Sequence, residues 1–559
     1  MELQEVGRYS VEPFALERIL ELELVKKINE HTRFYARGVL KEGVEDSLIH
    51  EQWEEKPIKL LEDGNPVFCG LAQDVGVICE NGVYYLEVEA VSWTVKLDKE
   101  EKRRSFQESG RSYSSIAGQL AGEAGGSVKC TAPEKTVQNL LLEYRETDWE
   151  FLKRLASHSG SVLVPDSKAE KPSFSFGLPA GSSHGEVTGG ILDFAVHKKA
   201  ARYRRLSLYE WVSQEQQAEE YTVCTAHAVA EIGDTVTIKG KTLYVRGADI
   251  KLKGSVLLCT LHATEKAGVS VQRFCHPYIS GLTLRGTVVK AVKDRVCVKL
   301  DIDLGQSGSY YPFPYATGFS NEGHTGWYVM PEEGDKVQII FPTEEEYTAY
   351  AVQSVRQEDT DRTEDPRVKY LRSADGKEIK LDRKEILITA NDGVTLIRMN
   401  EDSGIDIFTD KEVNVISDGD ITVQSDKNIS MTSKKNFSIH AGKDLDITAD
   451  GKINVSNDWN TMEMVPRKGT QLTSEDKINI AGEDNVDMTS NESINIASKA
   501  RMTLKSKDVM RAAASKDLTL FSGRKMSLTA ARALEEHCSG SSFNMDGTIS
   551  MKAKLIQEN

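Results

Sequence analysis

Apolar residues recur every eight positions along the last third of the chain. Between Ile405 and Leu528 they come in pairs, at positions i and i+2, and the residues between and after each pair are polar or small. The pairs that carry the pattern are Val413 and Val415, Ile421 and Val423, Ile429 and Met431, Phe437 and Ile439, Leu445 and Ile447, Ile453 and Val455, Ile478 and Ile480, and Ile494 and Ile496. The period shifts by one residue near 457–459 and then resumes. Since side chains two positions apart share a face of a strand, each octad predicts a short strand followed by a polar corner.

A single strand of this kind cannot bury its apolar face, so the repeat predicts a β-helical rod whose stacked strands share one interior. An α-helix would need apolar residues at i, i+3, i+4 and i+7, which these segments lack. One chain could wind alone, with three octads in each coil, or three chains could wrap around a common axis. A single-chain coil should show a modulation every three octads. None is seen, which favours three chains.

Three further regions precede the rod. Residues 1–275 show strand patterns mixed with short helices, and Thr147 with Glu150 forms a capping box for a helix over 147–156. A second helix is predicted from Ser114 to about Ala121. Residues 282–356 predict five short strands, which are typical of a small Greek-key barrel. We assign residues 357–378 to a polar linker or neck and residues 379–559 to the octad-repeat spike.

Composition narrows the classes of partner. The chain has 559 residues and a net charge of −16, which opposes nucleic-acid binding because phosphates require clustered Lys and Arg. The basic run Lys102-Arg103-Arg104 is flanked by glutamates and is expected to be a solvated loop. No segment approaches the ~20 apolar residues that span a bilayer. The first residues lack the basic and apolar parts of a secretory signal, so we expect synthesis and assembly in the cytosol.

Candidate chemistry is sparse. The eight cysteines contain no CxxC pair, which predicts buried thiols instead of disulfides or a zinc site. His537 with Cys538 is expected to be a surface corner, and His324 falls inside the barrel region. Cys224 and His227 could pair as nucleophile and base, but nothing in the sequence orients them. We therefore expect no catalytic residue, no cofactor and no metal site, and the chain is not expected to be an enzyme.

The order of these segments resembles the VgrG family of spike proteins from contractile injection systems. Three motifs carry the resemblance, none of them specific alone: residues 146–155 (ETDWEFLKRL) are similar to a hub helix of the family, residues 232–236 (IGDTV) to a hub turn, and residues 326–337 (GWYVMPEEGDKV) to its barrel turn. Those proteins look like a fusion of the tail hub and the tail spike of contractile phages. Together with the octads, the motifs cover nearly the whole chain.

The resemblance implies a mainly β fold. Residues 1–275 would hold two related barrel-like hub domains with short helices, residues 282–356 an OB-fold-like barrel, and the octads an intertwined triple-stranded β-helix. A homotrimer would present six similar hub units to the sixfold ring of an inner tube. The implied partners are an Hcp-like tube ring, baseplate proteins, a PAAR-like tip protein shaped as a small cone, effector cargo and, on injection, the target membrane. The particle would release or deliver the spike outside the cell on firing.

The last residues are expected to hold the tip protein. Four apolar residues keep strand alternation there: Phe543, Met545, Ile549 and Met551. An exposed apolar edge invites pairing. We expect no lysozyme-like domain before the rod, because the linker is too short, and no effector domain after it. The alternatives are a trimeric β-helical tail fibre or adhesin, and a β-helix polysaccharide lyase, which would need a cleft lined with convergent carboxylates. Type VI secretion, an extracellular particle and a phage-like bacteriocin all remain open as the host system.

Overall fold

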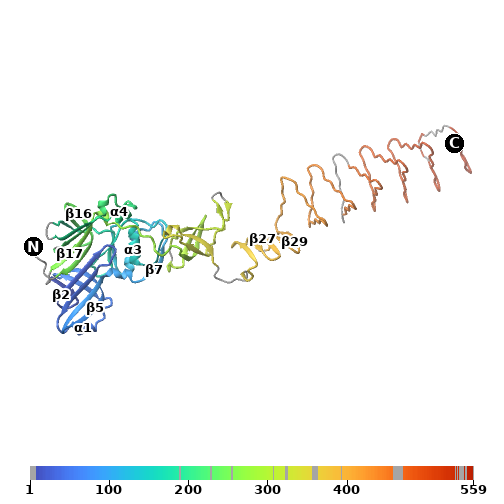
Figure 1. Cartoon of the computed structure of the whole chain (residues 1–559). Helices are drawn as coiled ribbons and strands as arrows, with labels where there is room; N and C mark the ends of the chain where they lie inside the picture. The colour runs from blue at the N-terminus through green and yellow to red at the C-terminus, as the bar shows by residue number, and fades with distance from the viewer. Residues whose placement is uncertain are drawn as a thin grey trace. The chain divides into compact units, whose positions relative to one another are not determined.

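The computed structural model describes residues 8–187, 191–226, 230–253, 256–305, 308–321, 325–355, 363–391, 393–456, 470–535, 537, 539–540, 547 and 550–557. The chain is mainly β and divides into two compact units, Met1–Ile421 and Thr422–Asn559 (Figure 1). Among the described residues, no helix combines the length and the apolar character that crossing a bilayer requires.

The largest sheet of the first unit has twelve strands, in the order β1-β4-β5-β6-β3-β2-β16-β17-β14-β13, with β12 and β15 attached at β16. The first half comprises β1 (Tyr9–Glu12), β2 (Leu16–Lys27), β3 (Arg33–Leu40), β4 (Pro57–Glu62), β5 (Asn65–Glu80) and β6 (Val83–Ser92), with α1 (Glu45–Ile49) beside β5. The second half comprises β12 (Ser183–Glu186), β13 (Ile191–His197), β14 (Glu220–Thr225), β15 (Thr235–Ile238), β16 (Lys241–Lys253) and β17 (Val256–Thr264).

The two halves of this sheet join through antiparallel pairing of β2 with β16, where Leu24 lies opposite Ile250. Both side chains belong to one apolar core that draws residues from the two halves. The two halves of the hub therefore share one sheet and one apolar core.

A helical layer lies between the halves in the sequence. Its elements are η2 (Trp93–Asp98), β7 (Glu101–Phe106), α2 (Tyr113–Glu123), β8 (Ser127–Cys130), β9 (Leu141–Thr147), α3 (Asp148–Ser157), β10 (Leu163–Pro165) and β11 (Ser173–Phe176). The short helices α4 (Ala200–Ser207), η3 (Glu215–Ala218) and η4 (Lys266–Val269) lie farther along the chain. Both predicted helices are confirmed. The capping box is also confirmed, because the Thr147 hydroxyl accepts from Glu150 N and the Glu150 carboxylate accepts from Thr147 N.

The barrel contains β18 (Thr283–Val292), β19 (Arg295–Leu300), β20 (Pro312–Pro314), β23 (Lys336–Ile340), η5 (Glu346–Thr348) and β24 (Tyr350–Ser354), with the small pair β21 (Ser320–Asn321) and β22 (Thr325–Gly326). Its strand order is β20-β19-β18-β23-β24, and a bridge between Tyr315 and Ala351 links the two edges. Two residues at β9, Leu140 and Leu142, pack into the barrel core, while Leu141 between them packs into the core of the helical layer. The strand β9 thus belongs to both cores.

An antiparallel sheet follows the barrel, which we name the neck sheet. It runs β25 (Lys369–Arg372), β26 (Glu378–Leu381), β27 (Glu385–Asn391), β28 (Thr395–Asn400) and β29 (Gly404–Phe408), each strand pairing with the next. The sequence pattern assigns residues 357–378 to the linker and residues 379–559 to the spike, so the neck sheet includes parts of both. Leu396 also stands eight residues after Ile388, and a rod with an eight-residue period requires these two side chains to share a face. In the structure Ile388 pairs with Ile397, so Leu396 lies on the opposite face.

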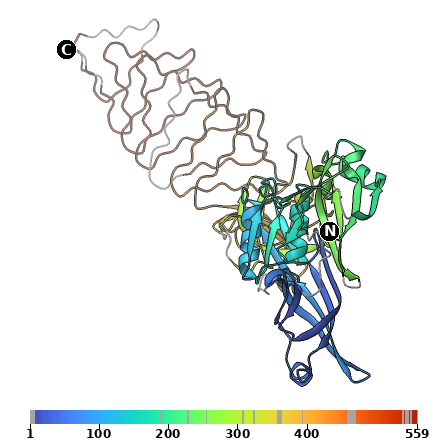
Figure 2. The same ribbon diagram turned by 90° about the vertical axis from the view of Figure 1, so that its left-hand side faces the viewer.

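The second unit contains no assigned helix or strand among its described residues. Bends recur every eight residues, at 426–427, 434–435, 442–443 and 450–451, and again from 475–476 to 531–532. They coincide with the predicted polar corners, and the trace in Figure 2 shows their regular succession. Every described residue of this unit is exposed.

Candidate functional site

The junction between hub and barrel is held by a buried arginine. Arg154 lies on the inner side of α3 and is 2% exposed. Its Nε and Nη2 donate to the two carboxylate oxygens of Glu146, each at 2.9 Å, and Nη2 also donates to the Leu142 carbonyl at 2.6 Å. Its Nη1 donates to Glu346 Oε1 at 2.5 Å. Because Glu346 belongs to η5, one guanidinium joins the hub to the barrel.

Electrostatics at this junction follow from burial. Burial lowers the pKa of Arg154, but the carboxylates of Glu346 and Glu146 outweigh it and raise that pKa overall. Burial raises the pKa of the Glu146 carboxyl, and Arg154 opposes the rise. His276 Nε2 lies 3.3 Å from Glu146 Oε2, and burial together with Arg154 lowers the pKa of this imidazole to about 3. His276 is therefore neutral at pH 7, and Arg154 carries the positive charge of the network.

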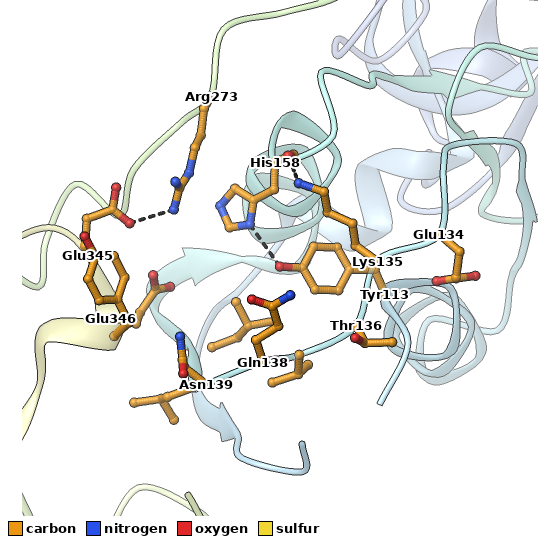
Figure 3. Close-up of a pocket in the computed structure, with 14 residues that line it drawn as sticks. Tyr113, Glu134, Lys135, Thr136, Gln138, Asn139, His158, Arg273, Glu345 and Glu346 are labelled. Carbon is orange, nitrogen blue, oxygen red and sulfur yellow. Dashed lines mark hydrogen bonds and ion pairs between the residues drawn. The ribbon is translucent and has the colours of Figure 1, made fainter. Parts of the chain in front are cut away.

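Beside the network lies a cleft of about 450 Å³, lined from the hub by Tyr113, Lys135 and His158 and from the barrel side by Glu345 and Glu346 (Figure 3). Tyr113 Oη lies 3.1 Å from His158 Nδ1, and the Lys135 ammonium donates to the His158 carbonyl. Burial, then Arg154, lowers the pKa of His158 to about 3, and burial raises the pKa of Tyr113 to about 12. Neither group is poised to transfer protons at neutral pH, and the lining includes neither serine nor cysteine. The cleft is therefore a polar contact region between the hub and the barrel.

A second ionic cluster overturns one prediction. The run Lys102-Arg103-Arg104 is not a solvated loop, because it forms part of β7 and pairs with β9. Arg104 donates to Glu143 at 2.5 Å and to Glu123 at 2.6 Å, and it also pairs with Asp148. Burial raises the pKa of Glu143 to about 8, against the pull of Arg104. The alternation of basic and acidic residues here belongs to a paired strand, which charge counting alone does not detect.

The octad pairs form the other candidate site. All sixteen predicted spike residues, from Val413 to Ile496, are exposed in the single chain, with fractions between 49% and 73%. None of them contacts a partner strand, because no pairing is assigned beyond β29 in the described residues. Their burial on a common axis remains a prediction.

Two family models match the chain, in the order hub then rod. Residues 52–216 match the phage tail baseplate hub (GPD) family, and residues 393–508 match a family described as uncharacterized protein conserved in bacteria (DUF2345). The chain is a VgrG-like spike protein. No curated protein matches it. The match to the baseplate hub family supports a role as a hub or spike component of a phage-tail-like particle.

Solved structures similar to the VgrG-like protein come from the same kinds of particle. The E. coli c3393 protein, a component of the type VI secretion system described as similar to the T4 tail proteins gp27 and gp5, is 13% identical; the match covers 62% of this chain and 99% of that one, with a TM-score of 0.47. A chain of the lidless PdpA–VgrG complex is 9% identical; the match covers 71% of this chain and 97% of that one, with a TM-score of 0.45. A 43 kDa tail protein of prophage MuSo2 from Shewanella oneidensis is 10% identical. The match covers 47% of this chain and 98% of that one, with a TM-score of 0.38. These scores are low, so the identification rests on the family models and their order.

The remaining candidate residues of the VgrG-like protein fall in several places. Of the tip residues, Phe543, Met545 and Ile549 lie outside the described residues, and Met551 is exposed. His324, His227 and Cys538 also lie outside them, while Cys224 is buried on β14. His537 is exposed, with Nε2 3.4 Å from Glu535 Oε2.

Sequence reasoning missed the Arg154 network. One signal was available. Arg154 lies on the face of α3 that carries the buried apolar residues, instead of on the face that points to solvent. Its partner Glu346 lies 192 residues away and carries no local pattern.

Proposed function

We propose that the chain forms a homotrimeric spike that joins the sixfold inner tube of a contractile particle to a threefold, membrane-puncturing needle. The observation that carries this proposal is the unpartnered octad array. Paired apolar side chains recur along the rod, and those in its described residues are all exposed. Burying an aliphatic side chain contributes ~1.5–3 kcal/mol, so an array of this length strongly favours a covered state.

A trimer is the simplest arrangement that buries the apolar side chains of the octads. With one wall from each chain, the residues at i and i+2 of every octad face a common axis, and the polar corners stay in solvent. A single-chain coil would instead bring octads together within one chain. The exposure of every described octad residue supports the three-chain arrangement.

The hub supports the part of the proposal that concerns binding to the inner tube. Each chain carries two barrel-like halves in one sheet, joined at β2 and β16. Three chains would therefore offer six similar surfaces, which suits an Hcp-like ring and its neighbouring baseplate proteins. A tail fibre or adhesin could use the same rod, but the baseplate-hub match over residues 52–216 favours a spike.

The trimer is tested by mass. Light scattering on the purified full-length chain is expected to give about three times 62.1 kDa. A stable monomer that keeps its β circular-dichroism signal would contradict the trimer and would favour the single-chain coil.

The tip is tested by truncation. We propose that the last apolar residues, including Met551, bind a PAAR-like cone protein that can carry effector cargo. A chain ending at Ala530 is expected to trimerise and to retain the tube ring, yet to lose the cone protein in a pull-down. The full-length chain is the control. Normal capture of the cone by the truncated chain would place the docking surface elsewhere.

A further inference from the structure

Helix α4 and the two residues before it are strongly basic, on a chain whose net charge is −16. Residues 198–205 contain no acidic residue and five basic ones: Lys198, Lys199, Arg202, Arg204 and Arg205. We name these five residues the α4 basic cluster. All of them except Arg202 are exposed. Within α4, whose residues are all described, only Leu206 is buried, and the helix lies on the outside of the hub (Figure 1).

The guanidinium that fixes α4 to the hub shares its carboxylate with other cations. Arg202 Nη1 donates to Glu220 Oε1 at 3.1 Å, and Arg246 Nη1 donates to the same oxygen. Lys199 Nζ lies 3.6 Å from the other carboxylate oxygen of Glu220. Burial, followed by the neighbouring Arg246, lowers the pKa of Arg202 to about 10, so Arg202 stays charged at pH 7. One carboxylate therefore serves three cations.

The adjacent carboxylate is shared in the same way. Glu219 lies 3.9 Å from Lys198 and 3.7 Å from Lys241, and Lys241 also reaches Glu265 at 3.9 Å. The acidic residues packed around α4 are thus already engaged by cations. They leave the α4 basic cluster with an excess of positive charge.

The stability of the helix accounts for only part of this charge. Arg204 and Arg205 lie in the last turn of α4, where the helix dipole favours cations. Lys198 and Lys199 precede the first turn, where the dipole disfavours cations, and no acidic residue of that turn offsets them. Neither Arg204 nor Arg205 forms an ion pair with any residue that the structure describes. Their donors are free to meet a partner.

An exposed apolar residue adjoins the α4 basic cluster. Leu208 directly follows the helix and is 79% exposed. Beside it Tyr209 stacks on Trp211, with ring centroids 4.8 Å apart, and Trp211 packs closely against Gly160. The segment that carries Leu208 is therefore anchored to the hub. Arginine and aromatic side chains are enriched at protein–protein interfaces.

We propose that the α4 basic cluster binds an acidic segment of a partner protein. Carboxylates of that segment would form the charge-assisted hydrogen bonds that Arg204 and Arg205 lack within the chain. An anionic membrane or a nucleic acid fits less well, because the net charge of −16 repels an extended anionic surface. A peptide segment meets only the cluster. This inference does not depend on the proposed homotrimer.

Binding of a fluorescein-labelled decaglutamate peptide to the full-length chain tests the inference. The double variant Arg204→Gln, Arg205→Gln removes two exposed cations and leaves Arg202 and Leu206 in place. Fluorescence anisotropy at low salt is expected to show roughly tenfold weaker binding, because two exposed ion pairs are lost. The control Lys434→Gln, Lys435→Gln makes the same charge change at exposed positions of the rod and is expected to bind as wild type does.

The variants and a second probe separate the outcomes. Weaker peptide binding by the Arg204→Gln, Arg205→Gln chain alone supports the inference. Equal binding by both double variants, or no binding by wild type, overturns it. Vesicles of phosphatidylserine and phosphatidylcholine are the second probe, and tighter binding to them than to the peptide through the same arginines overturns the protein partner. Light scattering on each sample reports the trimer separately, and the single variants replace the double variant if its circular-dichroism spectrum is lost.

Discussion

Replacing Arg154 with alanine is expected to destabilise the chain by roughly 3–5 kcal/mol, the cost of removing one partner from a buried ion pair. The substitution would leave Glu146 and Glu346 buried without their shared cation. It would also remove the hydrogen bond to the Leu142 carbonyl. Urea unfolding followed by tryptophan fluorescence measures the effect, since Trp149 is buried on the same helix.

A matched control separates this effect from loss of a charge in general. Arg398→Ala breaks a pair with Asp406 that is about half exposed, and such pairs contribute ~1 kcal/mol or less. The triple variant Arg154→Met, Glu146→Gln, Glu346→Gln removes the charges together and is expected to recover much of the lost stability. If the Arg154→Ala variant unfolds at the wild-type urea concentration, the network does not hold the junction.

Introducing aspartate at Ile439 is expected to abolish the trimer. In the proposed rod this change places three carboxylates near one axis, at a cost on the order of several kcal/mol for each unpaired buried charge. In the isolated chain Ile439 is 60% exposed, so the same change costs a monomer little. Light scattering and an injection assay measure the loss.

Asp426→Ser is the control for that variant, because Asp426 stands at a bend in the same part of the rod. Its mass and injection activity are expected to match wild type. Normal assembly of the Ile439→Asp chain would mean that the assigned inner face of the octads is wrong.

Local patterns were enough to predict much of the fold. The capping box at Thr147 and Glu150, the helices α2 and α3, and the octad corners each depend on residues within one turn or one repeat. Barrel strands were visible because apolar residues alternate between turns, as in β19 and β23. In each case the deciding interactions are short in sequence.

Pairings between distant segments could not be predicted in this way. Leu24 and Ile250 join the hub halves across more than 200 residues, and no spacing rule connects them. In the neck sheet the spacing misled, because a hairpin turn reverses the chain and sets the register of Ile388 against Ile397. The Arg154 network could not be predicted for a related reason. Arg154 was visible as a residue of the hub helix, but its partner in the barrel was not.

The position of β9 between two cores constrains how such spikes can be recombined. Leu140 and Leu142 complete the interior of the barrel, although the strand belongs to the hub. A barrel cut away at its first strand would lose both side chains and expose the apolar surface that they cover. Grafting a new needle onto an existing hub therefore requires a breakpoint after the barrel, between β24 and β25. Each hub then keeps the barrel whose core its own β9 completes.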